Sequence, residues 1–343
     1  MKFECTATIF REAVQLLHPV CPVRTTLPIL QNLRIQSQPG KVLLTATDLD
    51  IAMRTEISAE VTEEGETTIP VRVLLDALRR MSAEKIELQS DNNDVSTLRA
   101  GTKVECRLRG LPTGDFPKFQ PIESEDTISM PAKELAAMLR HTDYAVSKDE
   151  TRYVLNGVCF SFGKEFDVVA TDGRRLAKYS MPDISRDEAQ QIVLPTKTVT
   201  IINQMLDTDP DANAQLRFTS SQVEVTVNVT TLVSRLIDGH YPNFQQVIPK
   251  GCQAAVDVDR KTFLNAVNLA TVVTEKTKQS IVRLAFEKGQ LGVSATTAEI
   301  GDVNDVMEVD YDGEPVELAF NPMYLTDVCQ SVESDTITLE LSN

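Results

Sequence analysis

The stretch from Arg152 to Ala177 is the middle copy of an internal repeat, and the fold can be predicted from that repeat. It contains Arg152–Val158 (RYVLNGV) and, ten residues later, Val168–Ala177 (VVATDGRRLA). The strand-like end of the second run has an earlier counterpart at Leu44–Asp48 (LTATD) and a later one at Val293–Thr297 (VSATT). The three lie about 125 residues apart, a step far too long for a solenoid repeat. This spacing predicts three domains of one kind, here called copies one, two and three.

Three further kinds of marker keep nearly the same step. They are a helix-like run (Ile9–Val14, Glu134–Leu139, Thr262–Val267), a second helix start (Ile69-Pro70, Leu194-Pro195, Phe320-Asn321) and a closing turn (Gly114–Pro117, Asp238–Pro242). Alternating strand patterns fill the intervals, so we expect an α+β fold with two helices packed on antiparallel sheet in each copy. The predicted domains are residues 1–122, 128–249 and 254–343. The counterpart of Pro242 would lie past Asn343, so we expect copy three to lack its last strands.

Composition narrows the class of protein. The 343 residues include 42% apolar residues, with no run that could cross a membrane, and the N-terminus lacks an apolar signal core, which predicts a cytoplasmic protein. Six scattered cysteines and three histidines show no metal spacing, so no metal or cofactor is expected. A net charge of −16 argues against nucleic acid as a partner, unless the cations gather on one surface.

The helices predicted for copies one and two carry such cations. The first helix of copy one should bury Ile9, Ala13, Val14 and Leu17. The second, after Ile69-Pro70, should bury Leu74, Leu75, Leu78 and Met81, and its other face shows Arg72, Arg79 and Arg80. Lys197 opens the matching helix of copy two. Basic residues on an exposed helix face are usually only solvated, so each cation alone is a weak signal.

No catalytic constellation is evident, and we expect no enzyme. His18, His141 and His240 fall at different points of the repeat and cannot build a shared site. Asp172 stands beside two arginines, but Asp48 holds the same place in copy one, which favours a turn whose carboxylate binds its own backbone. The run Arg174-Arg175-Leu176 is specific to copy two. It could serve a binding surface or be a solvated turn with a buried leucine.

Jointly, five motifs closely resemble the bacterial DNA polymerase sliding clamp family, the beta subunit of the replicative polymerase. The motifs are Thr26–Leu30, Thr45–Leu49, Arg152–Gly157, Ala170–Ala177 and Asp238-Gly239 before Pro242. The resemblance covers all three copies. It departs from the family at Arg174, where the family often has His, and at Gln246, where it often has Arg.

The resemblance implies a processivity factor: a head-to-tail dimer whose six domains form a ring around duplex DNA without reading its sequence. Residues implied to face DNA are Arg24, Arg72, Arg79, Arg80 and Lys197. A pocket for short peptide motifs of polymerase, clamp loader and repair proteins is implied at Arg152, Leu155, Thr171, Gly173, Arg174, Arg175, Leu176, Pro242, Val247, Asn321 and Tyr324. The implied dimer interface comprises Val104, Cys106, Leu108, Val272 and Val273. The alternative is a three-domain protein-binding scaffold that does not encircle DNA.

The number of predicted helices also favours a dimer. Six helices side by side at a spacing of roughly 10 Å enclose a clear hole of only about 9 Å, too narrow for a duplex. Twelve helices at the same spacing leave about 28 Å, which admits DNA with a layer of water and ions. We therefore expect two chains in the working unit.

Overall fold

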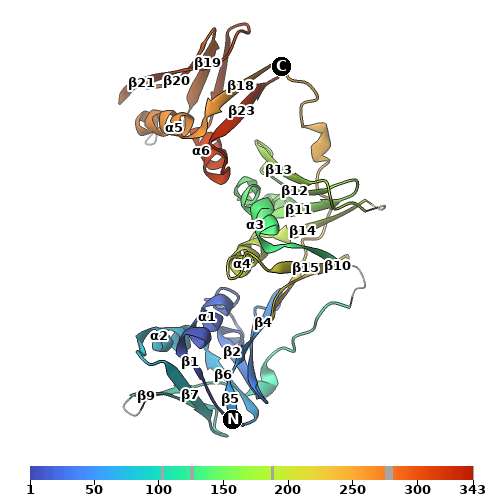
Figure 1. Ribbon diagram of the computed structural model, residues 1–343, viewed down its shortest axis with the longest axis vertical. Coiled ribbons are helices and arrows are strands. Elements are labelled where there is room, and N and C mark those ends of the chain that lie inside the picture. Colours follow the sequence, from blue (N-terminus) through green and yellow to red (C-terminus); the bar gives the residue numbers. More distant parts are fainter. Residues whose placement is uncertain (102–103, 124–126, 187–188, 275–280, 343) are drawn as a thin grey trace. The chain divides into compact units, whose positions relative to one another are not determined.

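The computed structural model describes residues 1–101, 104–123, 127–186, 189–274 and 281–342 (Figure 1). The chain forms two compact units. The first unit contains 1–170 and 179–240, and the second contains 171–178 and 241–343. Each unit is described by itself below. No helix in the described ranges is both long and apolar enough to cross a membrane.

Copy one lies in the first unit. Its helices are α1 (Ala7–Leu17) and α2 (Val71–Arg80). Its strands are β1 (Lys2–Thr6), β2 (Asn32–Gln38), β3 (Lys41–Thr47), β4 (Ile51–Ser58), β5 (Glu60–Glu63), β6 (Gly65–Pro70), β7 (Lys85–Ser90), β8 (Val95–Ala100) and β9 (Val104–Arg109). Helices α1 and α2 pack against each other, and α1 lies on β3 and β4. One sheet runs in the order β5-β1-β7-β8-β9, which leaves β9 at its edge.

Burial on α1 corrects one expectation. The helix begins at Ala7, and its buried residues are Ala7, Phe10, Ala13, Val14 and Leu17. Ile9 is 45% exposed, so its predicted place in the core is wrong. A start at residue 7 puts residues 10, 13, 14 and 17 on the inner face, and position 9 then points outward. Helix α2 buries Leu74, Leu75 and Leu78 as predicted, and Met81 follows its last turn half-buried.

Copy two continues the same sheet. Its helices are α3 (Ala132–Arg140) and α4 (Thr196–Leu206). Its strands are β10 (Thr127–Pro131), β11 (Gly157–Phe162), β12 (Phe166–Thr171), β13 (Leu176–Met181), β14 (Gln190–Pro195), β15 (Asn213–Phe218), β16 (Gln222–Val227) and β17 (Thr230–Arg235). Strand β17 pairs antiparallel with β4 of copy one, from Thr231 opposite Arg54 to Ser234 opposite Ile51. Copies one and two therefore share one eight-stranded sheet, β10-β15-β16-β17-β4-β3-β2-β6.

Copy three makes up most of the second unit. Its helices are α5 (Arg260–Thr274) and α6 (Pro322–Ser331), which pack together (Figure 1). Its strands are β18 (Ala254–Asp259), β19 (Val282–Glu287), β20 (Gln290–Thr297), β21 (Gly301–Glu308), β22 (Val316–Phe320) and β23 (Thr336–Leu341). The sheet β21-β20-β19-β22 and the pair β18-β23 enclose a core that includes Phe263, Phe286 and Tyr311. The helix pair on antiparallel sheet thus recurs in all three copies.

Candidate functional site

The turn after β12 is built from its own side chains. Asp172 Oδ1 accepts hydrogen bonds from the backbone N–H groups of Arg174 (2.9 Å) and Arg175 (3.0 Å). Thr171 Oγ1 donates to the carbonyl of Arg175 (2.6 Å) and accepts from the N–H of Gly173 (3.0 Å). Gly173 has φ +83°, a conformation that glycine adopts without steric cost. The structural interpretation of Asp172 is confirmed.

The corresponding turn of copy one has the same bonds. Asp48 Oδ1 accepts from the N–H groups of Asp50 (3.0 Å) and Ile51 (2.7 Å), and Thr47 Oγ1 donates to the carbonyl of Ile51 (2.8 Å). In copy three, Thr297 Oγ1 contacts the carbonyl four residues ahead, that of Gly301, at 3.5 Å. The buried residues Val293 and Ala295 match the buried Leu44 and Ala46, so Thr297 holds the place of Asp48, as the sequence predicts.

Arg175 fixes this turn to α6 inside the second unit. Its guanidinium lies 3.2 Å from Asp172 Oδ2, 2.6 Å from Asp327 Oδ2 and 4.6 Å from the centre of the Tyr324 ring. The Arg175 side chain is only 15% exposed. Asn321 caps α6 by accepting from the N–H of Met323 (3.0 Å). Three predicted pocket residues, Arg175, Asn321 and Tyr324, are thus brought to one place.

Asp327 is a residue that sequence reasoning missed. In the sequence it is only an acidic residue three positions after Tyr324. This spacing places both side chains on one face of a helix. An acidic residue on an exposed helix is common, so the spacing alone could not reveal its partner. Asp327 meets a cation 152 positions away in the chain.

The other predicted pocket residues lie partly or wholly at the surface of their own units. Leu176 is half-buried, so it is not the buried leucine of the solvated-turn alternative. Arg174 is exposed. In the second unit, Pro242 is exposed and Val247 is 69% exposed. In the first unit, the exposed Arg152 and the half-buried Leu155 belong to a short 3-10 segment, Glu150–Asn156.

Cations predicted to face DNA gather on copy one. Arg24, Arg72, Arg79 and Arg80 are exposed, and α2 carries three of them. Within the described ranges none of the four makes an ion pair, although most arginines of the sheets do. Exposed positive charge is thus concentrated on α2 and the loop at Arg24 of an acidic chain, the condition under which its net charge does not exclude nucleic acid as a partner.

Lys197 is placed differently from these arginines. Its ammonium lies 2.5 Å from Asp48 Oδ2 and donates to the carbonyl of Val20 at 3.1 Å. The same Asp48 carboxylate holds the turn after β3 through its other oxygen. Lys197 therefore ties α4 of copy two to the turn of copy one, and its charge is already neutralised there.

We expect Lys197→Met to weaken the fold and to leave DNA binding nearly unchanged. The pair is partly exposed, 44% and 15% for its two side chains, so its loss should cost about 1 kcal/mol. The melting temperature should fall by about 2–4 °C, while the salt dependence of DNA binding stays the same. Lys133→Met is the matched control, because it removes an exposed cation of α3 that makes no ion pair in the described part of the chain. A smaller salt dependence of DNA binding in the Lys197 variant, but not in the Lys133 variant, would show that Lys197 contacts DNA.

The predicted interface residues divide into accessible and buried ones. On the edge strand β9, Val104 is 47% exposed and Cys106 half-buried, but Leu108 is only 8% exposed. On α5, Val272 is 64% exposed and Val273 is 7% exposed within the core of copy three. Leu108 lies on the same face of β9 as Val104 and Cys106, since residues two apart point to one side of a strand, and its burial comes from packing near β6 and α2. Val273 faces inward because side chains rotate around a helix. Leu269, 49% exposed one turn before Val272, is an apolar residue that sequence reasoning missed.

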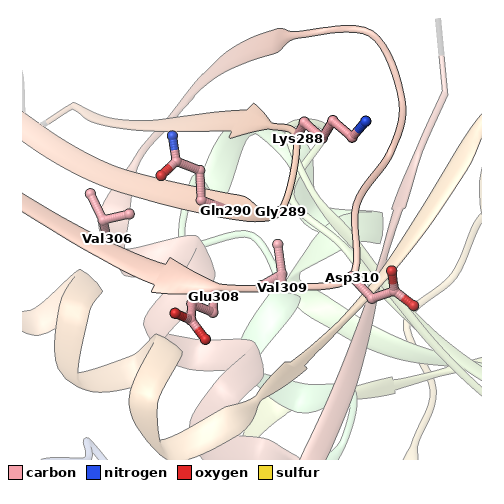
Figure 2. Close-up of a pocket in the computed structure, with 7 residues that line it drawn as sticks. All are labelled: Lys288, Gly289, Gln290, Val306, Glu308, Val309 and Asp310. Carbon is pink, nitrogen blue, oxygen red and sulfur yellow. The ribbon is translucent and has the colours of Figure 1, made fainter.

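A separate hollow lies at the hairpin ends of copy three. Its lining comprises Lys288, Gly289, Gln290, Val306, Glu308, Val309 and Asp310. Figure 2 shows these side chains spread in different directions rather than converging on one point. None belongs to the predicted sites. Among the described residues, no group of three or more His, Cys, Asp or Glu side chains could hold a metal ion.

Comparisons with known proteins agree with this architecture. Models of the N-terminal, central and C-terminal domains of the DNA polymerase III beta subunit match residues 1–120, 129–243 and 245–343. The chain belongs to the DNA polymerase III beta subunit family. The beta sliding clamp of Pseudomonas putida is 30% identical over 98% of this chain and 93% of its own length. That of Chlamydia trachomatis is 29% identical over 100% of this chain and 82% of its own.

Solved structures of family members have the same fold. A Pseudomonas aeruginosa sliding clamp bound to griselimycin has a TM-score of 0.94 and 27% identity, covering 100% of this chain and 93% of that one. The DNA polymerase sliding clamp of Bacillus subtilis has a TM-score of 0.92 and 28% identity with the same coverage. The predicted family and the predicted three-domain α+β fold are therefore confirmed.

Proposed function

We propose that the chain is a non-catalytic processivity factor of DNA replication in the cytoplasm. Two chains would close a ring around duplex DNA and hold the replicative polymerase, the clamp loader and repair proteins. Besides family membership, one observation carries this proposal: Arg72, Arg79 and Arg80 of α2 and Arg24 of the loop after α1 are exposed and have no anionic partner in the described chain. Unneutralised guanidinium groups suit phosphates, and phosphate contacts carry no base information.

Closure of the ring has a physical basis in the shared sheet of the first unit. Strand β17, the third strand after α4, pairs with β4, the third strand of the β2-β3-β4 series of copy one. The strand of copy one that corresponds to β17 is β9, and the strand of copy three that corresponds to β4 is β21. Both are edge strands, which expose unpaired backbone groups. Repeating the same pairing between two chains would join them head to tail.

The exposed side chains suit that joint. Val104 and Cys106 on β9, Val306 on β21 and the apolar pair Leu269 and Val272 on α5 are accessible in their own units. Leu108 and Val273 would support this surface from within. Within the second unit, the peptide-binding surface would include the Thr171–Leu176 turn with Asn321, Tyr324, Pro242 and Val247. Griselimycin, which is bound to the Pseudomonas aeruginosa relative, offers a ligand with which to test that surface.

Topological linkage is the decisive test. A fluorescent form of the chain is loaded by a bacterial clamp loader onto nicked circular DNA and separated from free protein by gel filtration. We expect the label to travel with the circle at high salt and to leave after a restriction enzyme cuts the circle once. Label that stays on linear DNA would show adsorption instead of a ring. Absence from the circle would favour the scaffold that does not encircle DNA, which no observation in the structure supports.

A further inference from the structure

Two adjoining hollows cross the helical face of copy one. They share His18, Leu75 and Arg79, and their volumes are about 600 and 620 Å³. One reaches the loop at Pro22 and the start of α2, and the other runs along α1 to Gln204 of α4. All of these residues belong to the first unit. Together the hollows form one elongated depression, here called the copy-one groove.

Three guanidinium groups line the groove. Arg72 belongs to the first hollow, Arg11 to the second and Arg79 to both. Within the ranges that the structure describes, none of the three has an ion-pair partner, in contrast to Lys197. Two carboxylates, Glu12 and Asp76, also line the groove, so its net charge is weakly positive. In a chain of net charge −16, that balance favours an anionic ligand over a cationic one.

The rest of the lining is apolar or carries amides. Leu16, Leu75 and Pro22 offer apolar contact, and the side-chain amides of Gln15, Gln31 and Gln204 can donate and accept hydrogen bonds. An amide is suited to the edge of a nucleic-acid base, which also carries both donors and acceptors. An acidic peptide would use the arginines and leave these amides without a specific role.

We propose that the copy-one groove holds a short stretch of unpaired DNA strand, with its phosphates at Arg11, Arg72 and Arg79 and its bases over the apolar and amide groups. The proposal rests on the proposed function, because that function places this face toward DNA. The two hollows hold only about 600 and 620 Å³, so the groove admits part of one strand and not a duplex. A clamp at a junction of duplex and single strand would hold the unpaired strand here.

The chemistry predicts weak, salt-sensitive binding. No Phe, Tyr or Trp lines the groove, so the stacking that strengthens most single-strand sites is absent. Each phosphate contact to a single strand changes the slope of log K against log salt by about −0.7, so three contacts give about −2. A variant that lacks one contact and binds as the parent does at 1 M salt should bind about eightfold more weakly at 50 mM salt, because its slope is smaller by about 0.7.

The test is fluorescence anisotropy with a labelled oligothymidylate and the whole chain, repeated across salt concentrations. Arg79→Gln should lower the slope by about 0.7 and the affinity about eightfold, whereas Lys133→Gln, which removes an exposed cation of α3 outside the groove, should change affinity less than about twofold. Asp76→Asn removes a lining carboxylate and should tighten binding severalfold. Lys288→Gln removes an exposed cation of copy three and should change nothing.

Several outcomes would contradict the proposal that the groove holds an unpaired DNA strand. These are equal losses for Arg79→Gln and Lys133→Gln, no gain for Asp76→Asn, or displacement of the oligothymidylate by a duplex or by polyglutamate as readily as by unlabelled strand. The circular-DNA assay on the same proteins separates the two proposals. If the chain binds the single strand but is not retained on circles, the groove proposal stands and the ring is refuted. If it is retained on circles but its strand binding does not depend on the groove residues, the ring stands and the groove proposal is refuted.

Discussion

Replacement of Arg79 and Arg80 together by glutamate is expected to weaken duplex binding on the order of a hundredfold at 50 mM salt. Each phosphate contact to duplex DNA contributes about −0.9 to the slope of log K against log salt, so the loss of two lowers its magnitude by about 1.8. With equal binding of variant and parent at 1 M salt as the reference, this difference in slope alone gives a loss on the order of a hundredfold at 50 mM salt. The two added carboxylates increase the loss. Both side chains are exposed at the end of α2, so the melting temperature should hardly change.

The measurement is a salt titration of duplex binding by the variant and the parent, with circular dichroism to confirm the fold. Lys288→Glu and Lys133→Glu made together are the matched control, since both cations are exposed and unpaired in the described chain and the net charge changes equally. Equal slopes for variant and parent would remove Arg79 and Arg80 from the DNA surface. An equal loss in the control would mean that net charge alone governs binding.

Arg175→Ala is expected to destabilise the second unit by about 2 kcal/mol and to weaken griselimycin binding at least tenfold. The change leaves Asp172 and Asp327, 17% and 27% exposed, without their cation, and removes the contact with the Tyr324 ring. Breaking a buried pair costs about 3–5 kcal/mol, and the partial exposure here reduces that figure. Binding should suffer as well as stability because the Thr171–Leu176 turn loses its fixed position against α6.

A double-mutant cycle with Asp327→Asn checks the assignment. If the contact holds the turn, the effects of Arg175→Ala and Asp327→Asn on thermal unfolding should be less than additive, with a coupling of about 1 kcal/mol or more. Arg175→Lys keeps the charge but not the forked geometry and should lie between the parent and Arg175→Ala. Additive effects, or griselimycin binding unchanged in Arg175→Ala, would contradict this role for the turn.

Local and periodic features could be predicted from the sequence. The step of about 125 residues fixes the number of copies, because the same helices and strands recur in the same order. Asp48 and Asp172 could be assigned to turns because their partners are backbone groups two or three residues away. The arginine face of α2 followed from helical periodicity, because Leu74, Leu75 and Leu78 must point inward.

Contacts between distant segments were decided only by the tertiary structure. Lys197 and Arg79 look alike in the sequence, yet Lys197 meets an aspartate 149 positions away, whereas Arg79 meets no anion in the described chain. Arg175 likewise finds Asp327 in another copy. Nothing in a periodic pattern encodes such a meeting, since it depends on where one copy's turn lies against the next copy's helix. The sequence by itself determined the three copies and the arginine face of α2, and the tertiary structure determined which charged side chains remain available to a partner.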